Sequence, residues 1–198
     1  MNRLRSKLML VAGLGLAGVA GAQSVPRTQP YYSLNYIRSQ TARFQDVQVA
    51  LAEGYVPASA CDVAPPGIEG AMGIHFVRPD LLKIRPLANG RMSGTGTHTD
   101  FREPGILLYE PRPGGGYTLV GIENLVFADA WEAEGNTKPP KFNGRDYNYM
   151  EDDPDTPRDE AHNFVRHYDL HIWLYRENPN GMYNPWNPNV HCPGGMPH

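Results

Sequence analysis

The sequence contains only two cysteines, Cys61 and Cys192, and lacks the motifs of several common enzyme classes. It has no G-x-S-x-G turn of serine hydrolases, no H-E-x-x-H zinc motif and no internal repeat. It carries 18 Lys and Arg against 21 Asp and Glu, so it has no basic excess with which to bind nucleic acid or an anionic membrane. With 21 Gly and 19 Pro among 198 residues, the composition predicts short strands and many turns, and it argues against a helical bundle.

Residues 1–22 have the pattern of a secretory signal peptide. Basic residues precede an apolar run at Leu8–Val19, and Ala20-Gly21-Ala22 supplies a small-residue cleavage site. The run is short for a membrane span, and no later segment approaches 18 apolar residues. We therefore expect a secreted or periplasmic protein without a membrane span.

The two cysteines would share an oxidising compartment, which favours a disulfide between Cys61 and Cys192. A competing hypothesis is a soft metal site, such as a copper site, in the C-terminal tail. That tail clusters four residues of ligand type: His191, Cys192, Met196 and His198.

Hydrophobic periodicity and turn residues predict a single α+β domain over residues 41–198. Its main feature is an antiparallel sheet or partly open barrel, with one N-terminal helix and long loops. The expected order is an extended lead-in at 23–40, a helix from Thr41 to about Gly54, a Pro-rich loop at Pro57–Gly70, a strand at Met72–Val77, a hairpin of Ile106–Glu110 and Tyr117–Phe127, a solvated acidic loop at Glu151–Glu160 and a last strand at His167–Arg176.

The segment "HYDLHIW" carries polar residues at every second position of an apolar run. In a strand, His167, Asp169 and His171 lie on one face, and the residues between them lie on the other. Two imidazoles with a carboxylate between them are typical of a metal site, in which the carboxylate can orient a ligand imidazole.

Two other apolar strands each carry one residue of ligand type. His75 lies in "MGIHFV" and Glu123 in "LVGIENLVF". A buried charge is costly unless it is paired or bound to a metal. We therefore predict a transition-metal site (Zn, Fe, Mn or Cu) whose ligands are His75, Glu123, His167 and His171. In a metal-dependent hydrolase or oxidoreductase, Glu123 or Asp169 would accept the proton. Gly73 and Gly121 would leave room above the site.

Simpler structural roles are open for each of these residues. His75 could bond a carbonyl, Glu123 could pair with Arg78 or Arg166, and the polar face of the last strand could be exposed to water.

A different class of function is also open. Aromatic residues in the C-terminal region could stack on a sugar ring in a non-catalytic module that binds a glycan or another component of the cell envelope. These residues are Trp173, Tyr175, Tyr183 and Trp186.

Several phrases of the chain, among them "MGIHF", "LLYEP", "HYDLHIW" and "WNPNVHC", resemble a group of small secreted bacterial proteins for which no activity is established. The resemblance covers Thr41 to Cys192. It implies an exported single domain and transfers no catalytic residues.

Overall fold

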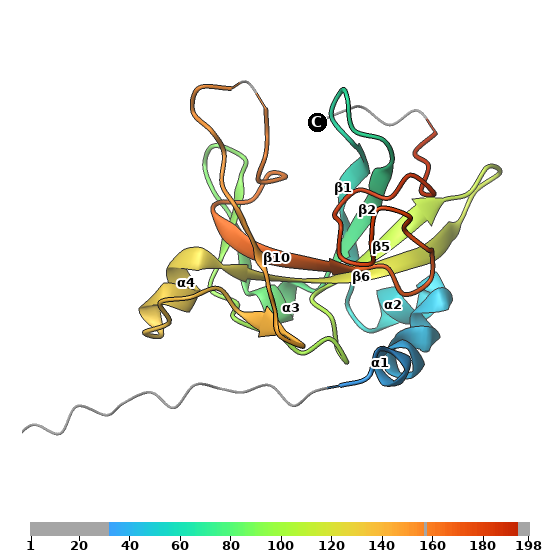
Figure 1. Ribbon diagram of the computed structural model, residues 1–198, viewed down its shortest axis with the longest axis horizontal. Coiled ribbons are helices and arrows are strands. Elements are labelled where there is room, and N and C mark those ends of the chain that lie inside the picture. Colours follow the sequence, from blue (N-terminus) through green and yellow to red (C-terminus); the bar gives the residue numbers. More distant parts are fainter. Residues whose placement is uncertain (1–31, 157, 194–198) are drawn as a thin grey trace, which may run out of the picture.

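The centre of the fold is a six-stranded sheet whose adjacent strands are all antiparallel and which curls into a half-barrel (Figure 1). In spatial order the strands are β1 (Val56–Val63), β2 (Ala71–Val77), β5 (Ile106–Pro111), β6 (Tyr117–Phe127), β10 (His167–Ile172) and β9 (Asn148–Met150). The structure, a computed structural model, describes residues 32–156 and 158–193. The predicted signal peptide and the tail residues Met196 and His198 lie outside them. The predicted α+β class is confirmed.

Short elements complete the domain. The helical segments are α1 (Leu34–Thr41), the 3-10 helix η1 (Ala42–Gln45), α2 (Val47–Ala52), α3 (Pro79–Leu82) and α4 (Ala128–Ala133). Two small hairpins are formed by β3 (Ile84–Pro86) with β4 (Met92–Gly94) and by β7 (Lys141–Phe142) with β8 (Arg145–Asp146). In the described part of the chain, no helix has the length and apolar character that crossing a bilayer requires.

The N-terminal region differs from the prediction in two ways. Residues 34–40, expected to be extended, are helical, because Ser33 caps α1 by accepting a hydrogen bond from the backbone N–H of Tyr36. The helix expected from Thr41 is broken at Asp46, whose backbone is extended and whose side chain accepts from the N–H of Gln48. The one predicted helix is therefore two short elements, η1 and α2.

The β5–β6 hairpin forms as predicted, and its register sets the two faces of the sheet. Leu108 pairs with Gly121 and Tyr109 with Leu119, so Val120 is an extra residue in β6. The carbonyl of Val120 accepts hydrogen bonds from the chain just after β10. The extra residue shifts the alternation along β6, so that Leu119 and Ile122 pack in one hydrophobic cluster while Val120 and Leu125 pack in the other.

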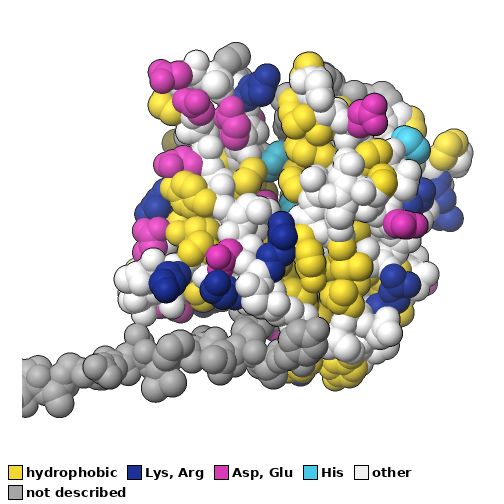
Figure 2. All heavy atoms as spheres, in the orientation of Figure 1, with side chains coloured by type: hydrophobic (Ala, Val, Ile, Leu, Met, Phe, Trp, Pro, Cys, Tyr) yellow, Lys and Arg dark blue, Asp and Glu magenta, His cyan; other side chains and the backbone are white. Residues whose placement is uncertain are grey.

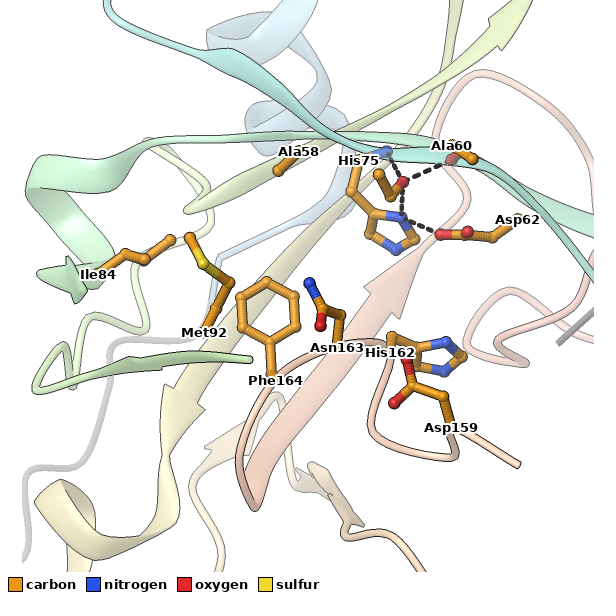
Figure 3. Close-up of a pocket in the computed structure, with 11 residues that line it drawn as sticks. Ala58, Ala60, Asp62, His75, Ile84, Met92, Asp159, His162, Asn163 and Phe164 are labelled. Atoms are coloured by element: carbon orange, nitrogen blue, oxygen red, sulfur yellow. Dashed lines mark hydrogen bonds and ion pairs between the residues drawn. The ribbon is translucent and has the colours of Figure 1, made fainter. Parts of the chain in front are cut away.

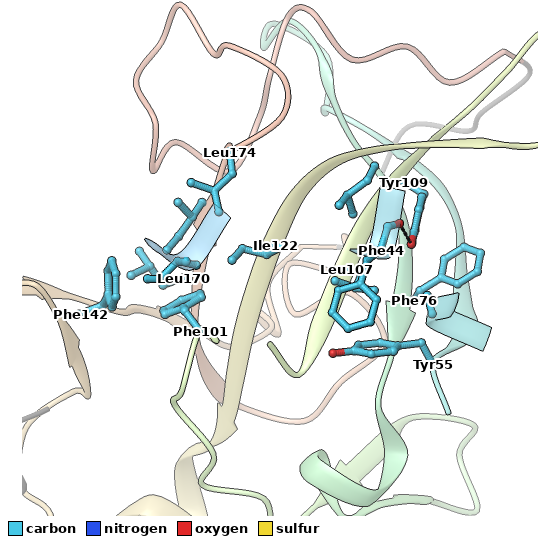
Figure 4. Close-up of a cluster of buried hydrophobic side chains, with 14 of the residues drawn as sticks. Phe44, Tyr55, Phe76, Phe101, Leu107, Tyr109, Ile122, Phe142, Leu170 and Leu174 are labelled. Carbon is cyan, nitrogen blue, oxygen red and sulfur yellow. Dashed lines mark hydrogen bonds between the residues drawn. The ribbon is translucent and has the colours of Figure 1, made fainter. Parts of the chain in front are cut away.

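Each face of the sheet has its own hydrophobic cluster. One cluster joins the sheet to the N-terminal helices and contains Phe44, Phe76, Tyr109 and Ile122 (Figure 4). The hydroxyl of Tyr109 donates to the carbonyl of Phe44 at 2.6 Å, which ties the helical layer to β5. The cluster on the other face includes Leu108, Leu125, Phe164 and Trp173, and this is the face with the polar residues of β10.

Two predicted boundaries are wrong. The segment expected to be a Pro-rich loop contains β1, an edge strand that tolerates Pro57 because two register shifts interrupt its pairing with β2. The last strand ends at Ile172 and does not continue to Arg176, because the N–H of Trp173 bonds the carbonyl of Met182 in the C-terminal loop.

The predicted disulfide between Cys61 and Cys192 is present, with the two Cα atoms 5.5 Å apart. It ties the C-terminal segment to β1 across 131 residues of sequence. A disulfide sulfur cannot serve as a thiolate ligand, which argues against the competing hypothesis of a copper site in the tail.

Candidate metal centre

Strand pairing places Glu123 and His171 side by side. His171 of β10 is the direct partner of Glu123 in β6, and partners in an antiparallel pair point to the same face. Each side chain is at most 2% exposed. The alternation along β10 thus correctly predicted that His167, Asp169 and His171 share one face. The pairing with β6 places His171, and not His167, next to Glu123.

His75 reaches the same point from β2, which is separated from β6 by β5. His75 pairs with Leu108, which pairs with Gly121, so all three lie on the face that carries Glu123. Strands two apart in a flat sheet are about 10 Å from each other. The curl of the sheet lets the His75 and Glu123 side chains converge.

The three side chains form a group with metal-ligand spacing. The Nε2 atoms of His75 and His171 each lie 3.4 Å from Oε2 of Glu123, and the ligand atoms of all three lie within 4.8 Å of one another. For metal–ligand bonds of about 2.1 Å at tetrahedral angles, neighbouring ligand atoms are about 3.4 Å apart. A charge-assisted N–H···O bond would be shorter, about 2.8 Å. The spacing fits ligands around an ion better than hydrogen-bonded partners.

Hydrogen-bond accounting supports this interpretation. Among the described residues, Oε2 of Glu123 and both ring nitrogens of His171 are buried without a hydrogen-bond partner. Buried polar atoms are rarely left unsatisfied, and those that are call for an unseen ion or water. These unsatisfied atoms belong to two of the three candidate ligand residues, Glu123 and His171.

The third ligand is oriented by Asp62 of β1. Nδ1 of His75 donates to Oδ2 of Asp62 at 2.7 Å, and Oγ of Ser59 lies 3.1 Å from the same nitrogen. This leaves Nε2 of His75 directed at Glu123. A carboxylate that holds the second nitrogen of a ligand imidazole fixes its tautomer and raises its affinity for metal.

The pKa values reflect burial and close charges. Burial alone would lower the pKa of His75, but the hydrogen bond and charge of Asp62, with the charge of Glu123, raise it to about 9. Burial raises the pKa of Glu123 to about 8, despite the opposing effect of His75. Burial also lowers the pKa of His171 well below its usual range. A metal ion would replace the protons on His75 and Glu123.

His167 and Asp169 lie on the same face but are not among the three clustered ligands. Nδ1 of His167 donates to the carbonyl of Val165 at 2.9 Å, and its Nε2 lies 3.9 Å from Oδ2 of Asp169. Asp169 also accepts a hydrogen bond from Asn148 of β9 at 3.3 Å, and burial raises its pKa to about 7. His167 is therefore not among the three clustered ligands, although sequence alternation gave it the same rank as His171.

Asp62 was missed in the sequence because its segment was interpreted as a loop. One signal pointed to it: Asp62 follows Cys61, and the predicted disulfide implies a fixed position for this segment. His162 was also missed. Its ring lies 6.4 Å from that of His75 and 5.9 Å from that of Trp186, in a loop that no periodicity marks.

The simpler roles for Glu123 and β10 do not hold. Arg78 pairs with Asp80, and Arg166 binds Glu132 through two hydrogen bonds, so neither arginine neutralises Glu123. The polar face of β10 does not meet water either, since His167, Asp169 and His171 are each at most 2% exposed.

The alternative of a glycan-binding surface loses one of its residues, and the expected role of the glycines changes. Trp173 is 2% exposed, with its indole N–H bonded to the carbonyl of Asn184, so it cannot stack on a ligand. A Cβ at Gly121 would lie 3.1 Å from the ring of Trp173, and one at Gly73 would lie 2.7 Å from the carbonyl of Tyr109. These glycines permit close packing and do not leave open space above the site.

A cavity of about 230 Å³ borders the group on the His75 side. Segments from β1, from β3–β4 and from the loop before β10 enclose it (Figure 3). Figure 2, in the orientation of Figure 1, shows the surface hollowed beside the β1–β2 hairpin, with histidine side chains visible inside the hollow. The buried group is therefore next to a space that a small molecule can occupy.

Comparison with protein-family models, curated proteins and solved structures found no match. The case for a function rests on the geometry of the site.

Proposed function

We propose that this protein binds one divalent transition-metal ion through His75, Glu123 and His171. The observation that carries the proposal is the convergence of three buried ligand atoms at metal-ligand spacing, of which Oε2 of Glu123 and Nε2 of His171 have no hydrogen-bond partner. The hydrogen bond from His75 to Asp62 gives further support, because it is the arrangement that ligand histidines usually have.

The donor set indicates the class of metal. Two imidazoles and one carboxylate suit Zn²⁺, Fe²⁺, Mn²⁺ or Cu²⁺, whereas Ca²⁺ and Mg²⁺ prefer oxygen ligands. Catalytic zinc and non-haem iron sites commonly use three protein ligands and keep positions open for water or substrate. The same count of ligands here favours a metal-dependent hydrolase or oxidoreductase over a structural metal site.

Asp169 is the remaining buried carboxylate on this face that can take part in proton transfer. Its charge acts on both His75 and Glu123, and its raised pKa of about 7 lies in the range suited to a general base. Glu123, as a ligand, is less suited to that role. We therefore propose that Glu123 acts as a metal ligand and that Asp169 acts as the general base that accepts the proton.

Export is part of the proposal. The disulfide and the signal-like pattern at residues 1–22 both support a secreted or periplasmic location. The resemblance to small secreted bacterial proteins agrees with this location.

Metal content tests the proposal directly. Mature protein, exported without a polyhistidine tag, should contain close to one transition-metal ion per chain by elemental mass spectrometry. His171→Ala should remove it. His167→Ala is the matched control, because it changes a buried histidine of the same strand that lies outside the group, and it should retain the ion.

Circular dichroism of both variants separates loss of a ligand from loss of the fold. A metal-free parent that also gains no thermal stability from added Zn²⁺, Fe²⁺, Mn²⁺ or Cu²⁺ would refute the proposal. Equal metal loss in the two variants, with both folded, would refute the choice of ligands.

A further inference from the structure

The cavity beside His75 has two chemically different ends (Figure 3). Ile84, Met92 and Phe164 line one end, and Asp62, His75, His162 and Asp159 line the other. We propose that this cavity binds the substrate of the metal centre, and that the substrate is a neutral molecule with an apolar body of about one benzene ring and a single polar group directed at the metal. This inference rests on the proposed metal site.

The size of the cavity supports a ring-sized body. An apolar cavity of about 150 Å³ is enough to bind benzene. The 230 Å³ here leaves room for a ring and a short polar substituent. The side chains of Ile84, Met92 and Phe164 offer the apolar contacts, and the polar end adjoins the imidazole of His75, whose Nε2 faces the other ligands.

The charges around the cavity favour a neutral ligand. The carboxylates of Glu123 and Asp62 balance the two positive charges of a divalent ion. Arg91 is shared between Asp159, whose Oδ1 lies 3.2 Å from its Nη2, and Asp152, so it has no positive charge to spare for a ligand. No Lys or Arg is among the described residues that line the cavity. An anionic substrate would therefore enter without a counter-charge, at a cost in desolvation.

The polar end is held rigidly. His162 and Asn163 both have left-handed backbones, with φ of 51° and 65°. Such backbone conformations are strained for residues other than glycine and persist where the surroundings enforce them. Here β4 enforces them: the N–H of Met92 donates to the carbonyl of Asn163 at 2.8 Å, and the N–H of Val165 donates to the carbonyl of Met92 at 2.9 Å. The backbone that carries His162 is thus held at the cavity wall, and its imidazole lines the cavity where it can contact the polar group of the substrate.

Benzyl alcohol and benzoate test this proposal, because they share a ring and differ in charge. The mature protein, loaded with Zn²⁺ and labelled at the methionine methyl groups, would be titrated with each compound while the Met92 signal is followed by NMR. Benzyl alcohol should shift this signal in a saturable way, and benzoate should bind at least tenfold more weakly.

Two variants locate the binding. Ala58→Phe places a ring in the cavity from an exposed position of β1 and should weaken benzyl alcohol binding at least tenfold. Val56→Phe adds the same ring to the same strand at an exposed residue that does not line the cavity, and it should leave binding unchanged.

The zinc content of each sample separates the possible failures. Stoichiometric zinc combined with no shift of Met92, with tighter binding of benzoate, or with unchanged binding by Ala58→Phe would overturn the cavity proposal and leave the metal site standing. If zinc does not bind, the samples would be loaded with Fe²⁺, Mn²⁺ or Cu²⁺ instead. Failure of all four ions to bind would overturn the proposed function and this inference together, whatever the probes do.

Discussion

Replacing Glu123 by Gln should stabilise the metal-free protein while abolishing its response to metal. Gln has nearly the shape of Glu but carries no charge and is a poor metal ligand. The pKa of Glu123 is raised by burial from 4.5 to about 8, so the folded chain holds this proton where the unfolded chain releases it. The folded state therefore loses stability as the pH rises from 4.5 to about 8.

The size of the effect follows from the pKa difference. Each pKa unit corresponds to about 1.4 kcal/mol, so at pH 8 ionisation of Glu123 destabilises the metal-free fold by about 4 kcal/mol. Gln removes that cost. For a chain of this length, about 4 kcal/mol corresponds to a rise in Tm of roughly 8 to 16 °C. Near pH 4 the carboxyl is protonated in both states, so the two proteins should melt at similar temperatures.

The measurement is the Tm of the parent and of the Glu123→Gln variant, taken on chelator-treated protein at pH 4, 6 and 8. Each melt is repeated with one equivalent of Zn²⁺. The parent should gain stability from zinc and the Glu123→Gln variant should not. A variant that melts below the metal-free parent at pH 8 would refute the cost of the buried carboxylate. A variant that zinc still stabilises as much as the parent would refute the role of Glu123 as a ligand.

Three further outcomes are expected. Asp62→Asn should weaken metal binding about 10- to 100-fold, because His75 loses the acceptor that orients it. A competition titration with a coloured chelator measures this affinity, and an unchanged value would contradict the role of Asp62. Metal binding at pH 7 should release about two protons, from His75 and Glu123, so affinity should rise with pH up to about 9. Calorimetry in buffers of different ionisation enthalpy counts these protons, and a count near zero would rule out displacement of either proton. Replacing Cys61 and Cys192 by Ser should lower the free energy of unfolding of the metal-free protein by up to about 5 kcal/mol, since the disulfide closes a loop of 131 residues. Urea titrations measure this change, and an unchanged midpoint would argue against the disulfide.

The site carries its own cost in stability. Glu123, Asp169 and His171 are buried on one face, where apolar residues of similar volume would avoid the penalty of desolvation. Buried titratable groups with shifted pKa values gather at functional sites more often than elsewhere. The predicted gain from Glu123→Gln tests whether this protein retains an unfavourable carboxylate because its metal requires one.

The sequence by itself determined the features that depend on one strand or one hairpin. Alternation along "HYDLHIW" assigned His167, Asp169 and His171 to a single face, because successive side chains in a strand point in opposite directions. The glycine-rich turn between two β-rich runs predicted the β5–β6 hairpin. The compartment implied by the signal-like segment predicted the disulfide between Cys61 and Cys192, which is present.

Only the tertiary structure decided which of these residues form the site. His167 and His171 are equivalent in their local pattern, and the pairing of His171 with Glu123 distinguishes them. His75 comes close to Glu123 and His171 because the sheet curls, although β5 lies between β2 and β6. Asp62 contacts His75 from the edge strand β1, which Pro57 made look like a loop in the sequence. Register and curl arise from contacts between strands far apart in the chain, and no local periodicity encodes them.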